Sequence, residues 1–145
     1  MHPHNYDMTK ALETIIKPRF SETDAMTHIG NTVMPVWFEE AREPLVRQLH
    51  PSLSIDDWPF IVAHIDVDYH QQIYVDSPVS VKAGVSKIGS KSFTIYHEAT
   101  QNGQRVASGN AVTVYYDYTT KQTGSLTDKL RSTLNDYIIT PKATG

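Results

Sequence analysis

The segment from Thr32 to Leu49 constrains the fold more than any other part of the chain. Apolar side chains recur there at every fourth position: Val33, Trp37, Ala41 and Leu45. This period predicts an amphipathic helix with one broad apolar face. Such a face needs a second apolar surface to cover it, so the rest of the chain must supply one.

The two ends of this helix are less clear than its middle. Asn31 or Thr32 can cap the first turn through a side-chain oxygen, and Pro35 is tolerated near that start. Pro44 lies deep inside the segment, where a proline removes one helical hydrogen bond and crowds the preceding turn. We therefore expect a kink or an early end of the helix at Pro44.

After a link at residues 51–59, the chain takes up the period of two that is typical of strands. Four segments alternate in this way: residues 61–69, 79–86, 93–100 and 106–118. The Asn102–Gly103 pair is a strong hairpin signal between the last two. Residues 11–20 predict a first strand, and residues 126–137 predict a short terminal helix capped by Ser125 or Thr127.

The expected order is therefore a strand, a long helix, four strands and a short helix. An apolar helix and an antiparallel sheet with one apolar face bury each other when the helix packs across the sheet. The sequence thus predicts an α+β fold in a single domain over residues 11–139. Residues 1–10 are expected to form a flexible N-terminal tail, and residues 140–145 a C-terminal tail.

Composition narrows the possible chemistry. The 145 residues include no cysteine, which excludes disulfides, thiolate zinc sites and a cysteine nucleophile. The formal net charge is -3, so there is no general attraction to nucleic acid or to anionic membranes. No signal peptide and no membrane-spanning apolar run are visible. We therefore expect a cytoplasmic protein that binds neither nucleic acid nor membrane.

The polar loop before the helix contains the residues most informative about function. Asp24 lies seven positions before Asn31, where the helix is expected to begin. A helix N-terminus presents unpaired backbone N–H groups that can hold the oxyanion formed when a carbonyl is attacked. A carboxylate facing the same carbonyl can act as general base or nucleophile. This layout suits acyl transfer to water, although Asp and Asn near a helix start are most often plain caps.

The segment from Arg19 to Asn31, together with residues 37–42 (WFEEAR), resembles the signature of the 4-hydroxybenzoyl-CoA thioesterase-like hotdog family. Weaker similarities lie at residues 65–69 and 87–93. The resemblance implies a hotdog fold, in which an antiparallel five-stranded sheet wraps around one long central helix. It also implies an acyl-CoA thioesterase that needs no cofactor and no metal.

The resemblance assigns roles to individual residues. Asp24 matches the family's catalytic aspartate, which attacks the thioester directly or activates water. The backbone N–H of Asn31 matches the oxyanion donor, at a position where some members carry a His. His28 occupies another position where many members have His, and we expect it to shape the pocket. Met34 and Trp37 are candidates to contact the acyl group, although such residues at helical spacing are usually core.

The family handles coenzyme A, whose phosphates need cations or N–H donors. The best local candidates surround a Gly-Ser turn: Lys87, Gly89, Ser90, Lys91 and Ser92. A plain solvated hairpin would have the same composition. Family members assemble as homodimers or homotetramers with joined sheets. The resemblance therefore implies that a second subunit completes the pocket with residues near His64.

Other interpretations stay open at this point. Four residues share one face of a predicted strand: His64, Asp66, Asp68 and His70. They suggest a metal site, but same-face neighbours lie about 7 Å apart, so at most two could share one ion. A polar strand face or a charged interface is the simpler explanation. The alternatives to thioester hydrolysis are a hotdog hydratase or dehydratase that uses His28 with Asp24, and a non-catalytic acyl-CoA-binding protein.

Overall fold

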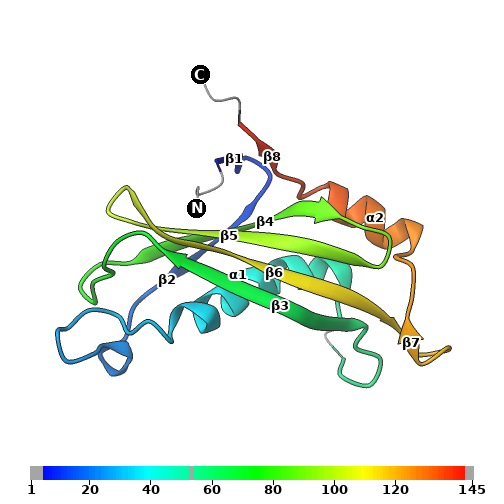
Figure 1. Ribbon diagram of the computed structural model, residues 1–145, viewed down its shortest axis with the longest axis horizontal. Coiled ribbons are helices and arrows are strands. Elements are labelled where there is room, and N and C mark those ends of the chain that lie inside the picture. Colours follow the sequence, from blue (N-terminus) through cyan, green and yellow to red (C-terminus); the bar gives the residue numbers. More distant parts are fainter. Residues whose placement is uncertain (1–4, 53, 143–145) are drawn as a thin grey trace.

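A computed structural model describes residues 5–52 and 54–142. Its main feature is an antiparallel sheet with the strand order β2-β4-β5-β6-β3, and the short β7 pairs with β6 (Figure 1). The strands are β2 Leu12–Ile16, β3 Phe60–Tyr69, β4 Val79–Ile88, β5 Ser92–Gln101, β6 Gln104–Asp117 and β7 Gln122–Thr123. The sheet curls around helix α1, Met34–Leu49, which confirms the predicted α+β hotdog architecture.

The apolar face of α1 packs against the inner face of this sheet. Trp37, Ala41 and Leu45 are all buried, as the four-residue period predicted. The first half of the helix packs with small and branched residues of the strands, including Val81 and Ala107. The second half contacts a cluster that contains larger strand residues: Phe60, Phe93 and Ile95. Burial of these apolar side chains is the main contribution to the stability of the domain.

The start of α1 differs from the prediction. Neither Asn31 nor Thr32 caps the helix, because the residue before it is Val33, which has helical backbone angles and no side-chain cap. The chain enters the helix through a backbone hydrogen bond instead, from Val33 N–H to the Gly30 carbonyl at 3.1 Å. Asn31 instead lines the open space beside the helix start.

Of the two outcomes expected at Pro44, a kink or an early end, the early end is wrong, since the helix runs on to Leu49. A proline at this position removes the hydrogen bond that the Glu40 carbonyl would accept. Glu40 is exposed, so water can replace the missing donor. The proline therefore costs less here than it would on the buried face of the helix.

The two ends of the described chain pair with each other. β1, Tyr6–Asp7, forms an antiparallel pair with β8, Thr140–Pro141 (Figure 1). Both strands belong to the segments that the sequence placed outside the domain. Residues 1–4 and 143–145 lie outside the described residues. This short pair joins the ends of the described chain across the sequence.

The outer elements are shorter than the sequence suggested. β2 ends at Ile16, and Phe20–Glu22 form a turn of 3-10 helix, η1, in place of the predicted strand end. Helix α2 covers Asp128–Asn135, and Thr127 caps it by accepting a hydrogen bond from Leu130 N–H at 3.1 Å. Within residues 5–52 and 54–142, no helix is long and apolar enough to cross a membrane.

β3 forms one edge of the sheet, and its outer side has no neighbouring strand in the described chain. A shift of register between Val62 and His64 indicates a β-bulge. Ile61, Val62 and Ile65 are 49%, 48% and 49% exposed along this edge. An open edge with exposed apolar side chains is a surface on which another strand can pair.

Candidate active site

The loop between β2 and α1 holds Asp24 in a tight turn. Its Oδ1 accepts a hydrogen bond from Met26 N–H at 2.9 Å, and its carbonyl accepts one from Thr27 N–H at 3.1 Å. Thr27 has a positive φ of 63°, which closes the turn. Asp24 is exposed, and its Oδ2 makes no hydrogen bond within the described residues. One carboxylate oxygen therefore anchors the loop, while the other is available to a ligand.

Asp24 lines an open cavity of about 700 Å³ beside the end of β3. The cavity lies between the loop that precedes α1 and the segment that follows β3. Its lining residues are Asp24, Ile29, Gly30, Asn31, Tyr69, His70, Gln71, Gln72 and Ile73. The structure thus brings together Asp24 and Asn31, the two residues that the sequence singled out in this loop.

Two backbone donors lie where the loop enters α1. Asn31 N–H and Thr32 N–H have no acceptor in the part of the chain that the structure describes. The first turn of a helix also carries the positive end of its dipole. The neighbouring Gly30 is held on both sides, since its N–H donates to the Glu22 carbonyl at 2.9 Å and its carbonyl accepts from Val33. The loop therefore holds unpaired donors in place beside the cavity.

Tyr69, the last residue of β3, is a cavity residue that the sequence analysis missed. Its phenol donates a hydrogen bond to the Asn31 carbonyl, which joins segments 38 residues apart in the sequence. Partial burial raises the pKa of Tyr69, so the phenol stays protonated and able to donate at neutral pH. No local sequence signal identified Tyr69 or its partner.

Comparison with known proteins identifies the family. A model described as the thioesterase-like superfamily matches residues 18–134. The chain belongs to the thioesterase-like superfamily. The matched range contains the loop with Asp24, the helix α1 and the strands β3 to β6, so it includes the whole candidate site.

Individual relatives are similar over most of the chain. YsmA of Bacillus subtilis strain 168, an uncharacterized protein, is 27% identical over 120 residues, which cover 82% of each chain. A structure described as a predicted thioesterase from Bacillus stearothermophilus is 37% identical, covers 91% of this chain and 99% of its own, and has a TM-score of 0.86. A thioesterase from Thermus thermophilus, solved with coenzyme A and Zn, is 25% identical with a TM-score of 0.78; it covers 86% of this chain and 91% of its own.

Two contacts tie the site loop of this thioesterase-like chain to the rest of the fold. Trp37 Nε1 donates to Glu22 Oε2 at 2.8 Å, and Ile29 N–H donates to the Ile73 carbonyl at 2.8 Å. Trp37 and Met34 are themselves buried in the apolar core. Neither residue is among those that line the cavity beside Asp24.

His28 lies next to Asp24 in the loop, but its ring faces another residue. The imidazole packs edge-on against Tyr74, with ring centroids 5.1 Å apart and an interplanar angle of 77°. The His28 carbonyl accepts a hydrogen bond from Asp24 N–H at 2.8 Å. No hydrogen bond joins the two side chains in the described chain, so the His–carboxylate pair of a hydratase is not formed.

The candidate coenzyme A hairpin lies away from this cavity. The turn between β4 and β5 sits beside α2, at the opposite end of the sheet from residues 20–31 (Figure 1). Arg131 Nη2 donates to the carbonyls of Gly89 and Ser90, at 2.9 and 3.2 Å. Lys91 belongs to the same turn, and Lys87 of β4 and Ser92 of β5 flank it. Within one chain, the hairpin and Asp24 therefore do not form a common site.

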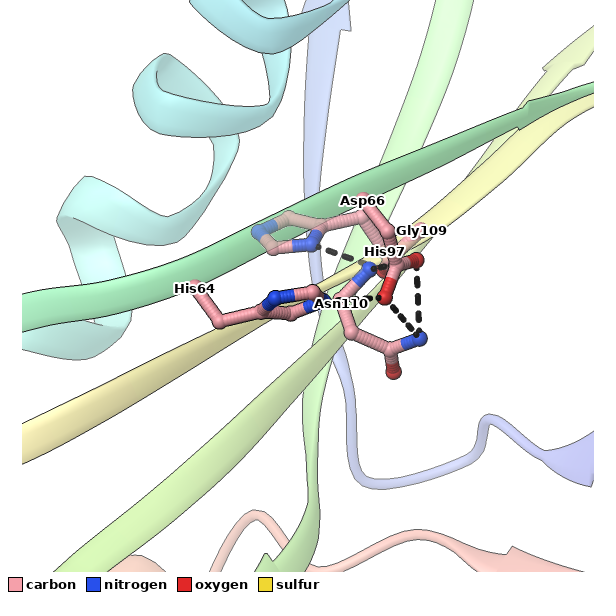
Figure 2. Close-up of polar contacts among 5 residues, drawn as sticks. All are labelled: His64, Asp66, His97, Gly109 and Asn110. Carbon is pink, nitrogen blue, oxygen red and sulfur yellow. Dashed lines mark hydrogen bonds and ion pairs between the residues drawn. The ribbon is translucent and has the colours of Figure 1, made fainter.

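The polar face of β3 carries a hydrogen-bonded cluster, shown in Figure 2. His64 Nε2 lies 3.1 Å from Asp66 Oδ2, and Asp66 Oδ1 accepts from the backbone and side-chain N–H groups of Asn110, both at 3.1 Å. Directly after the end of β3, His70 Nε2 lies 2.8 Å from Ser108 Oγ. The contacts of Asp66 with Asn110 and of His70 with Ser108 tie β3 and the residue after it to β6. In the described ranges, no group of three or more His, Asp or Glu is placed to hold a metal ion.

His97 of β5 is a second residue that the sequence analysis did not single out. It is fully buried, and its ring stacks on Phe38 with centroids 4.7 Å apart and planes 7° apart. Its Nδ1 lies 3.1 Å from the Gly109 carbonyl, as Figure 2 shows. A carbonyl only accepts, so Nδ1 carries the hydrogen, and Nε2 has no partner in the described chain. Burial first, and then the positive charge of Arg42, lower the pKa of His97 to about 3.

Proposed function

We propose that the chain is an acyl-CoA thioesterase, which hydrolyses an acyl-CoA thioester to a carboxylic acid and free coenzyme A. One observation supports this proposal above all others. Asp24 and Asn31 line the same open cavity, and the Asn31 N–H has no acceptor within the described residues. A thioester carbonyl bound there would meet an acid–base group and an oxyanion donor together.

The reaction follows from this geometry. The thioester oxygen accepts a hydrogen bond from Asn31 N–H, which stabilises the negative charge that develops on it. Asp24 either removes a proton from the attacking water or attacks the carbonyl itself and is released by water afterwards. In the first route Asp24 passes the proton taken from water to the departing sulfur as the C–S bond breaks. In the second route the C–S bond breaks as a mixed anhydride forms on Asp24, coenzyme A leaves as a thiolate, and the thiolate takes up a proton released by the water that hydrolyses the anhydride. Asp24 Oδ2, which accepts no hydrogen bond within the described residues, suits either role.

The free edge of β3 supports a homodimer as the active form. A second copy can pair its own β3 along this edge and cover Ile61, Val62 and Ile65. Antiparallel pairing about a two-fold axis would bring the second copy's strand near His64 toward the cavity at Tyr69. A homotetramer would contain the same pair. Sedimentation equilibrium would then give at least twice the chain mass of 16.4 kDa.

Coenzyme A recognition would also cross the subunit boundary. The Thermus relative was solved with coenzyme A, which supports a coenzyme A thioester as the substrate here. The Gly89 hairpin, with Lys87 and Lys91, is separated from Asp24 within one chain. It would therefore contact a coenzyme A molecule whose thioester lies in another subunit's cavity.

The test of this function is a panel of acyl-CoA substrates with detection of the released thiol. Asp24→Asn removes the base and nucleophile but keeps the size of the side chain, so kcat is expected to fall by about a thousandfold or more. Asp56→Asn is the matched control, because Asp56 is an exposed loop residue away from the cavity. Near-normal turnover of the Asp24 variant would contradict the proposal. Hydration of crotonyl-CoA would indicate a hydratase, and binding without thiol release a non-catalytic protein.

A further inference from the structure

The peptide units on either side of Asn31 set the directions of the two unpaired amides. The first unit contains the Gly30 carbonyl and Asn31 N–H, and its carbonyl accepts from Val33 N–H. The second contains the Asn31 carbonyl and Thr32 N–H, and its carbonyl accepts from the Tyr69 phenol. In a trans peptide the N–H and C=O point in opposite directions. A hydrogen bond that fixes a carbonyl therefore fixes the N–H of the same unit.

The two bonds differ in what they are attached to. The bond between Gly30 and Val33 spans three residues, so it moves with the loop. The bond from Tyr69 comes from β3, where Tyr69 is paired with Ala107 of β6. Only the second bond therefore ties the peptide between Asn31 and Thr32 directly to the frame of the sheet.

We propose that Tyr69 is a positioning residue: its hydrogen bond to the Asn31 carbonyl fixes the direction of Thr32 N–H, which serves beside Asn31 N–H as a second oxyanion donor. The proposal rests on the thioesterase function proposed above. Donors accelerate the reaction only if they already point at the developing oxyanion before it forms. Tyr69 acts through the peptide and needs no contact with the reacting atoms, so its loss should lower kcat more than it changes KM.

The first experiment replaces Tyr69 with Phe, which keeps the ring on the cavity wall and removes only the hydroxyl. We expect kcat to fall about tenfold while KM changes less than about twofold, since the donors remain but are less well directed. Tyr118→Phe is the control, because Tyr118 is 48% exposed against 47% for Tyr69 and lies outside the cavity. Both variants should keep the assembly and the melting temperature of the parent.

The second experiment measures the ¹⁵N relaxation order parameter of the Thr32 amide without substrate. Loss of the anchoring bond should lower it from about 0.85 to below about 0.6 in Tyr69→Phe and leave it unchanged in Tyr118→Phe. An unchanged kcat, a rise in KM alone, or an unchanged order parameter would overturn the positioning role. If the parent hydrolyses no acyl-CoA, the proposed function fails, and the order parameter alone decides whether Tyr69 orients this peptide.

Discussion

The buried imidazole of His97 makes the stability of this protein sensitive to acid. The pKa of His97 is about 3 in the folded chain, against 6.5 for a free histidine. Burial and Arg42 lower this pKa, while the Gly109 carbonyl and the negative charge of Asp66 oppose the shift without cancelling it. The folded state therefore keeps His97 neutral in a pH range where the unfolded chain takes up a proton.

The sign and size of the effect follow from this difference. Because the pKa of His97 is depressed in the folded state, neutral His97 makes its full contribution to the free energy of unfolding above about pH 6.5. This contribution is lost as the pH falls toward 3. One pKa unit corresponds to about 1.4 kcal/mol, so the free energy of unfolding should fall by about 1.4 kcal/mol per pH unit in this range. At pH 5 the loss from His97 alone is about 2 kcal/mol.

The assay compares the parent with His97→Gln, whose side chain cannot titrate but can still donate to the Gly109 carbonyl. Urea unfolding is followed at pH 7.5, 6.5, 5.5 and 5.0 with one fixed protein concentration, since assembly also affects apparent stability. Carboxylates and the other histidines contribute to both proteins and cancel in the difference. The advantage of the parent over the variant should shrink by about 2 kcal/mol between pH 7.5 and pH 5. A constant difference, or an NMR titration of the His97 ring near pH 6.5, would refute the reasoning.

Two further substitutions test the contacts that hold the site together. Gly109→Ala places a methyl group 2.1 Å from the Asp66 carbonyl oxygen and 3.0 Å from the Phe38 ring. Urea unfolding should therefore show that the free energy of unfolding falls by about 3 kcal/mol or more. A fall below about 1 kcal/mol would contradict the close approach of β3 and β6. Trp37→Phe removes the hydrogen-bond donor to Glu22. The free energy of unfolding should fall by about 1–3 kcal/mol, and proteolysis in the site loop should increase. Unchanged proteolysis would mean that this bond does not hold the loop.

The fold was predictable because its elements are long and regular. The helical period around Trp37 and the alternation of the four later strands each leave one apolar face, and those faces fit only when the helix crosses the sheet. The end of the helix was less predictable. The effect of Pro44 depends on whether the carbonyl of Glu40 faces solvent, and that depends on packing which a local pattern does not contain.

The candidate site was predictable only where its residues are close in sequence. Asp24 and Asn31 belong to one loop, so their spacing and the family resemblance identified both. Tyr69 lies beside Asn31 because of the register of β3 on β6 and the path of the loop. Neither can be read from the local periodicity of the sequence. His97 could have been found from the sequence, because it has the same parity as Phe93 and Ile95 and is the one titratable residue among the three. All three side chains lie on the buried face of β5.

The anchoring of the site loop explains how an exposed segment can offer fixed donors to a substrate. The loop has one turn of 3-10 helix and little other regular structure, yet three parts of the fold hold it: Trp37 of α1, Ile73 after β3, and Tyr69 of β3. Each contact restrains a different stretch, from Glu22 to Asn31. The conformational entropy of these residues is lost when the chain folds, so it need not be lost again when the proposed thioester substrate binds. On this argument, weakening any one anchor should lower turnover more than affinity. Tyr69, whose partner carbonyl is adjacent to the proposed oxyanion donors, should have the largest effect for the smallest change in stability.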